Sequence, residues 1–203
     1  MSVAERSPSP RGWHERAPQL TDGVITLRTL RSADAPSLVA HLDDPDVAEY
    51  ISPAPSSPEA FRRFIRWTQV ERRRRGFTCF GIVPPGASRP AGVIQVWPIE
   101  RDFSTAEWGF ALGTAFWGTG LFARAASLVL DAVFTDLGVH RLEARAVDVN
   151  RRGNRVFEKL GATRERAAGR FSRRRRVPRP TDVVDSRAGL ARPPRRGSPC
   201  ELT

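Results

Sequence analysis

The sequence predicts a mixed α/β domain in which antiparallel strands come first and a β-α-β unit follows late in the chain. Apolar runs typical of strands occur in five segments, at 24–27, 77–83, 92–97, 106–112 and 140–149. Between them, apolar residues recur at helical spacing, at 33–42, 58–70, 121–133 and 150–160. With a short helix after residue 45, the expected order is β-α-α-α-β-β-β-α-β-α, and a chain of 203 residues suffices for one such domain with tails.

The first strand and helix are marked by local signals. Residues 24–27 (Val-Ile-Thr-Leu) are largely β-branched and are followed by a polar turn. Ser32 is positioned to cap a helix over about 33–42. Pro45 and Pro53 should divide the next stretch into a short helix and a loop.

The next helix has a clear start. Ser57 precedes Pro58, so the sequence places a capping hydroxyl before a proline at the first helical position. The apolar stripe of this helix consists of Phe61, Phe64, Ile65, Thr68 and Val70. Four arginines, Arg72 to Arg75, suit the negative end of the helix dipole.

Three strands follow. Residues 77–83 and 92–97 flank Pro84-Pro85-Gly86, which is turn chemistry, so we expect a hairpin. The third strand, at 106–112, carries Gly109 at its centre, which suggests a bulge or a close approach of another backbone segment.

The β-α-β unit completes the expected fold. Gly118-Thr119-Gly120 precedes a helix whose apolar residues share one face, and His140 to Val149 alternates as a strand does. The last helix runs from Asn150 to Leu160 and should stop at Gly161.

Charge is concentrated in the C-terminal part of the chain. The net charge is +11, but residues 164–203 hold twelve arginines and four acids, a net of +8. Residues 1–163 therefore carry only +3, which does not favour a nucleic-acid-binding body. We expect a flexible lead-in at 1–21, a domain at 22–166, and a basic Pro/Arg-rich tail at 167–203 that is disordered or out of frame.

Composition excludes several classes. No stretch approaches the ~20 apolar residues of a membrane span, and the first ten residues lack the apolar core of a secretory signal. Cys79 and Cys200 alone form neither a disulfide framework nor a zinc site. We therefore expect a cytoplasmic protein without a metal or membrane partner. Lys159 is the only lysine among 33 basic residues, which indicates a GC-rich bacterial gene.

Two glycines before a helix indicate an anion site. In Trp117-Gly118-Thr119-Gly120-Leu121 the glycines let a phosphate approach the backbone, and the first N–H groups of the helix point toward it. Such a loop alone is weak support, because glycine before a helix is common.

A second motif adds a resemblance. Residues 150–162 read N-R-R-G-N-R-V-F-E-K-L-G-A and directly follow the next expected strand. At this spacing, the two motifs resemble the acetyl-CoA core of the GNAT N-acetyltransferases, in particular the RimJ/RimL-like branch. The resemblance runs over about residues 24–163. It implies the GNAT acyl-CoA N-acyltransferase fold, with the C-terminal strands missing or altered in this chain.

The resemblance also implies a binding mode for acetyl-CoA. Two parallel strands would splay apart, and the backbone of Phe110, Ala111 and Leu112 would pair with the pantetheine arm. Asn150 would bind the arm through its amide or cap the helix, and the two roles are compatible. The resemblance also places Asn154 among the residues that bind the cofactor. Pyrophosphate would lie on main-chain N–H groups of Gly118, Thr119, Gly120, Leu121, Phe122 and Ala123.

The chain departs from the family pattern at three positions. Ala115 replaces a Gln or Arg, Gly153 replaces a Ser common in the RimJ/RimL-like branch, and Phe157 replaces the Tyr that protonates the thiolate in other members. Tyr50 is the only tyrosine. The thiolate would therefore take its proton from water or from the substrate.

A base must accept a proton from the acceptor ammonium. Glu107 matches a glutamate common in the branch, and Glu143 on the neighbouring strand is the second candidate; each could instead be a half-exposed strand carboxylate. His41 and His140 are expected to be structural, and Trp97, Trp108 and Trp117 to line the core or a pocket. The implied reaction is acetyl transfer from acetyl-CoA to a primary amine in a ternary complex, and the acceptor is either a protein N-terminus, such as that of a ribosomal protein, or a small amine.

The C-terminal tail, residues 167–203, leaves open an alternative function for the protein. Permitted codons for residues 179–191, read one base out of register, yield Arg-Met-Trp-Ser-Ile-Leu-Ala-Pro-Asp-Trp, which resembles the closing strand of RimJ/RimL-like proteins. An out-of-frame tail would carry no function. A genuine tail favours a catalytically impaired GNAT-like protein that binds nucleic acid through its phosphates.

Overall fold

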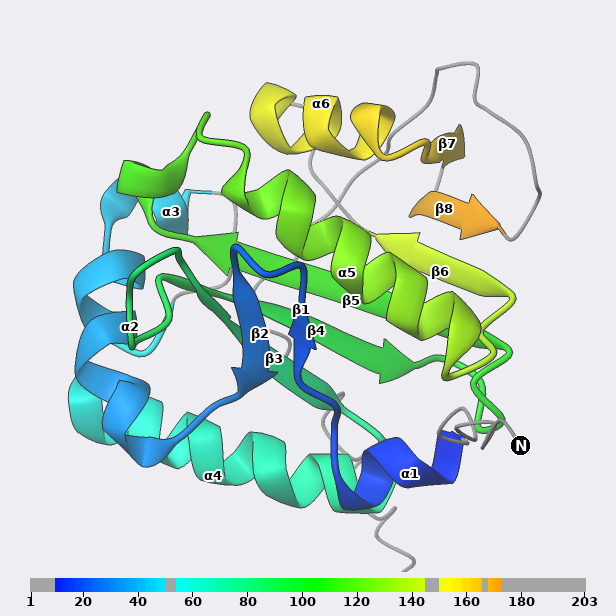
Figure 1. The fold of residues 1–203 in the computed structure, drawn as a ribbon, viewed down its shortest axis with the longest axis horizontal. Coiled ribbons are helices and arrows are strands. Elements are labelled where there is room, and N and C mark those ends of the chain that lie inside the picture. The colour runs from blue at the N-terminus through cyan, green and yellow to red at the C-terminus, as the bar shows by residue number, and fades with distance from the viewer. Residues whose placement is uncertain (1–9, 50–53, 145–149, 166–167, 173–203) are drawn as a thin grey trace, which may run out of the picture.

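The protein folds around one eight-stranded sheet with helices on both faces (Figure 1). The structure is a computed structural model, and it describes residues 10–49, 54–144, 150–165 and 168–172. The strand order is β1-β2-β3-β4-β5-β6-β8-β7. Neighbouring strands are antiparallel except β5 and β6, which are parallel. The mixed α/β class predicted from the sequence is confirmed.

The elements have the following bounds. The strands are β1 Leu20–Thr21, β2 Thr26–Thr29, β3 Thr78–Val83, β4 Gly92–Pro98, β5 Thr105–Leu112, β6 Arg141–Ala144, β7 Thr163–Glu165 and β8 Ala168–Ser172. The α-helices are α1 Pro10–Glu15, α2 Ala35–Leu42, α3 Pro45–Ala48, α4 Pro58–Arg75, α5 Leu121–Thr135 and α6 Arg151–Lys159. Short 3₁₀ turns, η1 Ser32–Asp34 and η2 Thr114–Phe116, precede α2 and the glycine loop.

Each face of the sheet has its own core. On one face, α5 and α6 pack on alternate residues of β4 and β5, such as Ile94, Val96 and Trp108. On the other face, α2 and α4 pack on the residues between them, such as Val93 and Ala111. The period of two along a strand thus sends neighbouring residues to different cores.

Local signals set the limits of α4 as expected. The Ser57 hydroxyl accepts a hydrogen bond from the Ala60 N–H at 3.2 Å, and Pro58 follows it. The helix ends at Gly76, whose φ of +75° lies in the left-handed region that favours glycine.

The N-terminal lead-in is shorter than predicted. Residues 10–21 are not a flexible segment: Trp13 is 1% exposed and meets Phe80 edge-on at 5.7 Å, and β1 pairs with β2. The composition of this segment is polar, but one large apolar side chain buried in the core holds it in place. Residues 1–9 lie outside the described part of the chain.

The C-terminal strand pair also differs from the expectation. β7 and β8 form a hairpin, and β8 pairs with β6, so the sheet continues through Ser172. The strands expected to be missing or altered are therefore present to this point. Residues 173–203, and with them the question of the reading frame, lie outside the described residues, as do residues 145–149 of the expected strand 140–149.

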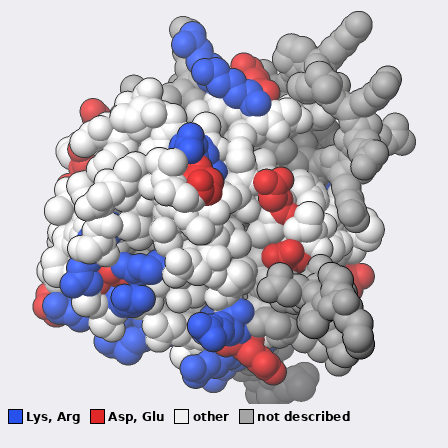
Figure 2. All heavy atoms as spheres, viewed as in Figure 1, with Lys and Arg blue, Asp and Glu red and all other residues white. Residues whose placement is uncertain are grey.

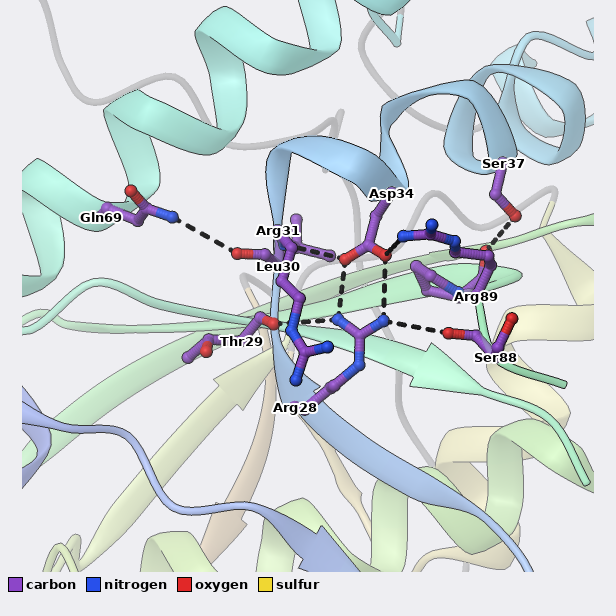
Figure 3. Close-up of polar contacts among 10 residues, drawn as sticks. Arg28, Thr29, Leu30, Arg31, Asp34, Ser37, Gln69, Ser88 and Arg89 are labelled. Atoms are coloured by element: carbon purple, nitrogen blue, oxygen red, sulfur yellow. Dashed lines mark hydrogen bonds and ion pairs between the residues drawn. The ribbon is translucent and has the colours of Figure 1, made fainter.

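A buried ion pair ties α2 to the sheet (Figure 3). Arg28 donates through Nη1 and Nη2 to the two carboxylate oxygens of Asp34, at 2.7 and 2.9 Å, and Asp34 is fully buried. The same carboxylate accepts from the Arg31 N–H at 2.8 Å and from Arg89 at 3.3 Å. Arg28 also donates to the Ser88 carbonyl, at 3.3 Å, so the network joins β2, η1 and the β3–β4 turn.

Candidate active site

The two candidate bases lie side by side. Glu107 on β5 and Glu143 on β6 are register partners, and because paired residues share a face, both carboxylates are on the α2/α4 side of the sheet. They are 8% and 9% exposed. The Arg141 Nε donates to Glu143 at 2.7 Å, which offsets one of two neighbouring negative charges.

The last described pair of β5 and β6 lies one residue beyond these carboxylates. The last registered pair in the described chain is Trp108 with Ala144, whereas β5 continues to Leu112. Hydrogen bonds at the ends of β5 show which way its backbone faces: Thr105 and Gly113 bond toward β4, and Ser104 bonds toward Arg141. By alternation, the N–H and C=O groups of Phe110 and Leu112 face the β6 side.

This alternation separates the three predicted pantetheine ligands. Ala111 has the opposite parity, so its backbone groups face β4, where it is the register partner of Val93. The Leu112 carbonyl accepts a hydrogen bond from Trp117 Nε1 at 2.8 Å, which fastens the glycine loop to the end of β5. Of the three residues, Phe110 and Leu112 thus present main-chain groups at the edge where the described pairing ends.

The glycine loop has the geometry of an anion site. Gly118 and Gly120 have φ values of +77° and +82°, and a Cβ at either position would meet open space within 4 Å. Gly120 directly precedes α5 as its N-cap residue and makes no side-chain capping bond. Thr119 orders the loop, because its hydroxyl donates to the Phe116 carbonyl at 2.7 Å and accepts from the Leu121 N–H at 3.3 Å. The side chains of Leu121 and Phe122 are buried, and Ala123 is half-buried.

Asn150 acts as a helix cap in this structure. Its Oδ1 accepts from the Gly153 N–H at 2.8 Å, and a Cβ at residue 153 would lie 2.9 Å from its Nδ2. Gly153 therefore leaves room for the asparagine amide that a serine would crowd. Asn154 follows in the same turn, where its N–H donates to the Asn150 carbonyl at 3.0 Å.

Phe157 lies in the core on the α5/α6 face of the sheet. It is 3% exposed and packs against Trp108 and Phe110, with ring centroids 5.9 and 5.6 Å apart. This residue therefore offers no acidic proton at the position where other family members have tyrosine, and Tyr50 lies outside the described residues. Burial raises the pKa of the Cys79 thiol, so this cysteine is not a ready nucleophile either.

The structure shows the contacts of His41 and the position of Trp97 relative to the two carboxylates. His41 packs edge-on against Phe116 at 5.5 Å and above Gly113, so it is structural, as expected. Trp97 is the register partner of Glu107 on β4, which puts its indole beside the paired carboxylates. Only the strand register shows this, because Trp97 and Glu107 are separated by the β4–β5 turn.

Other kinds of site have little support in the described part of the chain. No group of three His, Cys, Asp or Glu side chains there could hold a metal ion. Among the same residues, no helix combines the length and apolar character needed to cross a membrane. The arrangement places the candidate anion loop at the start of α5, on one side of the sheet, and the two carboxylates on the other side, next to the last described β5–β6 pair.

The sequence matches a family model described as an acetyltransferase (GNAT) domain over residues 25–163. A curated relative, an uncharacterized N-acetyltransferase p20 from Bacillus licheniformis, is 27% identical over 158 residues, which cover 72% of this chain and 87% of that one.

Solved structures share the fold. A putative acetyltransferase from T. thermophilus has a TM-score of 0.62 and 29% identity, covering 74% of this chain and 78% of the other. A ribosomal-protein-S5-alanine acetyltransferase from Vibrio fischeri has a TM-score of 0.66 at 17% identity, over 74% and 85% of the chains. RimJ from Mycobacterium smegmatis, in complex with CoA-disulfide, has a TM-score of 0.63 at 21% identity, over 73% and 75%.

Proposed function

The chain belongs to the GNAT family of acetyltransferases, and on that premise we propose that it transfers an acetyl group from acetyl-CoA to a primary amine by direct attack in a ternary complex. One observation carries the proposal: Glu107 and Glu143 are adjacent in the sheet, one residue from the point where the described β5–β6 pairing ends. On this proposal, the pantetheine arm along β5 and the base lie next to each other, beside the last described β5–β6 pair.

The chain supplies the acetyl-CoA site mostly through its backbone. The residues present fit a pyrophosphate, because the two left-handed glycines leave open space and the first N–H groups of α5 follow them. Phe110 and Leu112 would bind the pantetheine amides along the β6-facing edge of β5, much as a neighbouring strand would. The Asn150 amide nitrogen is the side-chain donor proposed for this arm. Acetyl-CoA supplies the thioester that is attacked.

Glu107 is the proposed general base. Its carboxylate accepts a proton from the acceptor ammonium, so that the neutral amine nitrogen bonds to the thioester carbon and the carbon–sulfur bond breaks. Glu143 forms a 2.7 Å ion pair with Arg141 and is the register partner of Glu107, and we assign it a positioning role beside that residue. The thiolate takes a proton from water or from the substrate, in line with the buried Phe157.

The acceptor is proposed to be a polypeptide N-terminal amine. Support comes from the resemblance to RimJ/RimL-like proteins and from structural neighbours that include the S5-alanine acetyltransferase.

The competing nucleic-acid function rested on the tail and has no support among the described residues, whose anion-binding feature is a compact loop rather than an extended basic groove.

The test compares Glu107→Gln with Glu143→Gln in the full chain, with the exposed Glu59→Gln on α4 as the matched control. Acetyl-CoA binding is measured by thermal shift and calorimetry, and transfer to peptide amines by mass spectrometry. We expect Glu107→Gln to bind acetyl-CoA but to lose about 10²–10⁴-fold in kcat/KM, as for removal of a general base. If the wild type shows no saturable stabilisation by acetyl-CoA, the proposed function is wrong.

A further inference from the structure

A continuous row of aromatic side chains runs from α4 to the carboxylates. Centroid distances are 5.9 Å from Phe64 to Trp67, 4.9 Å from Trp67 to Phe77, and 5.9 Å from Phe77 to Trp97. Phe77 is buried, whereas Phe64, Trp67 and Trp97 are half-buried, so the row packs on the core of the α2/α4 face and exposes parts of three rings. We refer to these four side chains as the aromatic row.

Trp97 joins this row to the candidate base. It is the register partner of Glu107, and its ring leans along the sheet over Gly109, where a Cβ would lie 3.4 Å from the indole. The bulge or close backbone approach predicted at Gly109 is not found: its pairing with Gln95 is regular, and the atoms nearest to it belong to the Trp97 side chain. The indole thus lies beside both the carboxylate and the end of the β5–β6 pairing.

The surroundings of the row disfavour an acceptor with several positive charges. Helix α4, which contributes Phe64 and Trp67, carries seven arginines and two glutamates, a net of +5. In the view of Figure 2, basic side chains gather along the lower edge of the molecule, where α4 runs in Figure 1. The two carboxylates on the sheet suit one ammonium group, whereas α4 repels further cations.

We propose that the aromatic row holds the side chain next to the acceptor amine, so that the preferred acceptor is a polypeptide N-terminus with an apolar or aromatic first residue. This inference rests on the proposed function, whose substrate class it narrows. Trp97 is its specificity-determining residue. Burial of one such side chain against the rings should favour these acceptors about tenfold to hundredfold over an N-terminal glycine.

The experiment uses peptides that differ only in the first residue, Phe, Leu or Gly, and a fourth that begins Phe-Lys-Lys. The wild type is compared with Trp97→Ala and with Phe134→Ala, a control that removes a half-buried aromatic ring from α5. Acetyl transfer gives kcat/KM for each peptide, and calorimetry with CoA present gives peptide affinity independently of transfer. Circular dichroism and thermal unfolding verify that each variant is folded.

In the expected result, the wild type prefers Phe and Leu over Gly at least tenfold, and the two lysines weaken that preference. Trp97→Ala reduces the ratio of kcat/KM for the Phe and Gly peptides to less than about threefold, and Phe134→Ala leaves this ratio unchanged. Equal affinity for the Phe and Gly peptides, or an equal loss on both in Trp97→Ala, overturns the inference. Preferential binding without acetyl transfer would leave the inference standing and refute the proposed function instead.

Discussion

Replacement of Asp34 by asparagine should destabilise the domain strongly. The variant keeps the shape of the side chain but removes the negative charge that faces Arg28, which is 9% exposed, at 2.7 and 2.9 Å. Loss of one partner of a buried ion pair costs about 3–5 kcal/mol, because the other charge is left buried without compensation. That is a large part of the ~5–15 kcal/mol by which domains are stable.

The effect of Asp34 should also depend on pH. Burial alone would raise the pKa of this carboxyl, but the hydrogen bonds from Arg28 and from the Arg31 N–H lower it overall. A carboxyl with a lowered native pKa stabilises the fold fully above its unfolded pKa, about 3.9, and loses this contribution as the pH falls through the native pKa. The difference between wild type and Asp34→Asn should therefore be constant near neutral pH and narrow below about pH 4.

Urea unfolding followed by tryptophan fluorescence at pH 7, 5 and 3 measures both effects. The double variant Arg28→Met/Asp34→Leu is the control, because two apolar residues of similar size leave no unpaired charge and should recover most of the lost stability. A loss below about 1 kcal/mol at pH 7, as for an exposed ion pair, would refute the reasoning. A gap that stays constant down to pH 3 would refute the assigned direction of the pKa shift.

Three further substitutions test other parts of the structure. Gly120→Ala places an L-residue at a φ of +82°, at a cost of about 1–2 kcal/mol. This variant should bind acetyl-CoA more weakly in calorimetry. Gly86→Ala, at a φ of +70° in a distant turn, is the control and should leave acetyl-CoA binding unchanged. Gly113→Ala would bring a Cβ within 2.9 Å of the His41 Cβ. The free energy of unfolding measured in urea should therefore fall by about 1–3 kcal/mol. An unchanged free energy of unfolding would show that α2, which carries His41, can move away. Trp13→Ala should cost about 3–5 kcal/mol in the same assay, and a negligible loss would contradict the ordered packing of residues 10–21.

Much of the fold was predictable because its signals are local. Ser57, Pro58 and Gly76 limit α4 through hydrogen bonds and backbone angles that involve only adjacent residues. The Gly118–Gly120 loop is equally local, since the strand, the left-handed turn and the start of α5 are contiguous in sequence. Trp13 was not predictable in this way, because the side chain that holds it, Phe80, is 67 positions away in the numbering of the chain.

The sequence by itself determined the order of the elements from β2 to α6, the glycine loop proposed to bind an anion, and the residue types available for catalysis. Only the tertiary structure decided which of those residues meet. Parallel register places Glu107 beside Glu143, antiparallel register adds Trp97, and strand parity separates Phe110 and Leu112 from Ala111. The reason is physical: a shift of one residue in strand pairing sends every side chain to the opposite face of the sheet, and the pairing is selected by the two cores together rather than by any one segment.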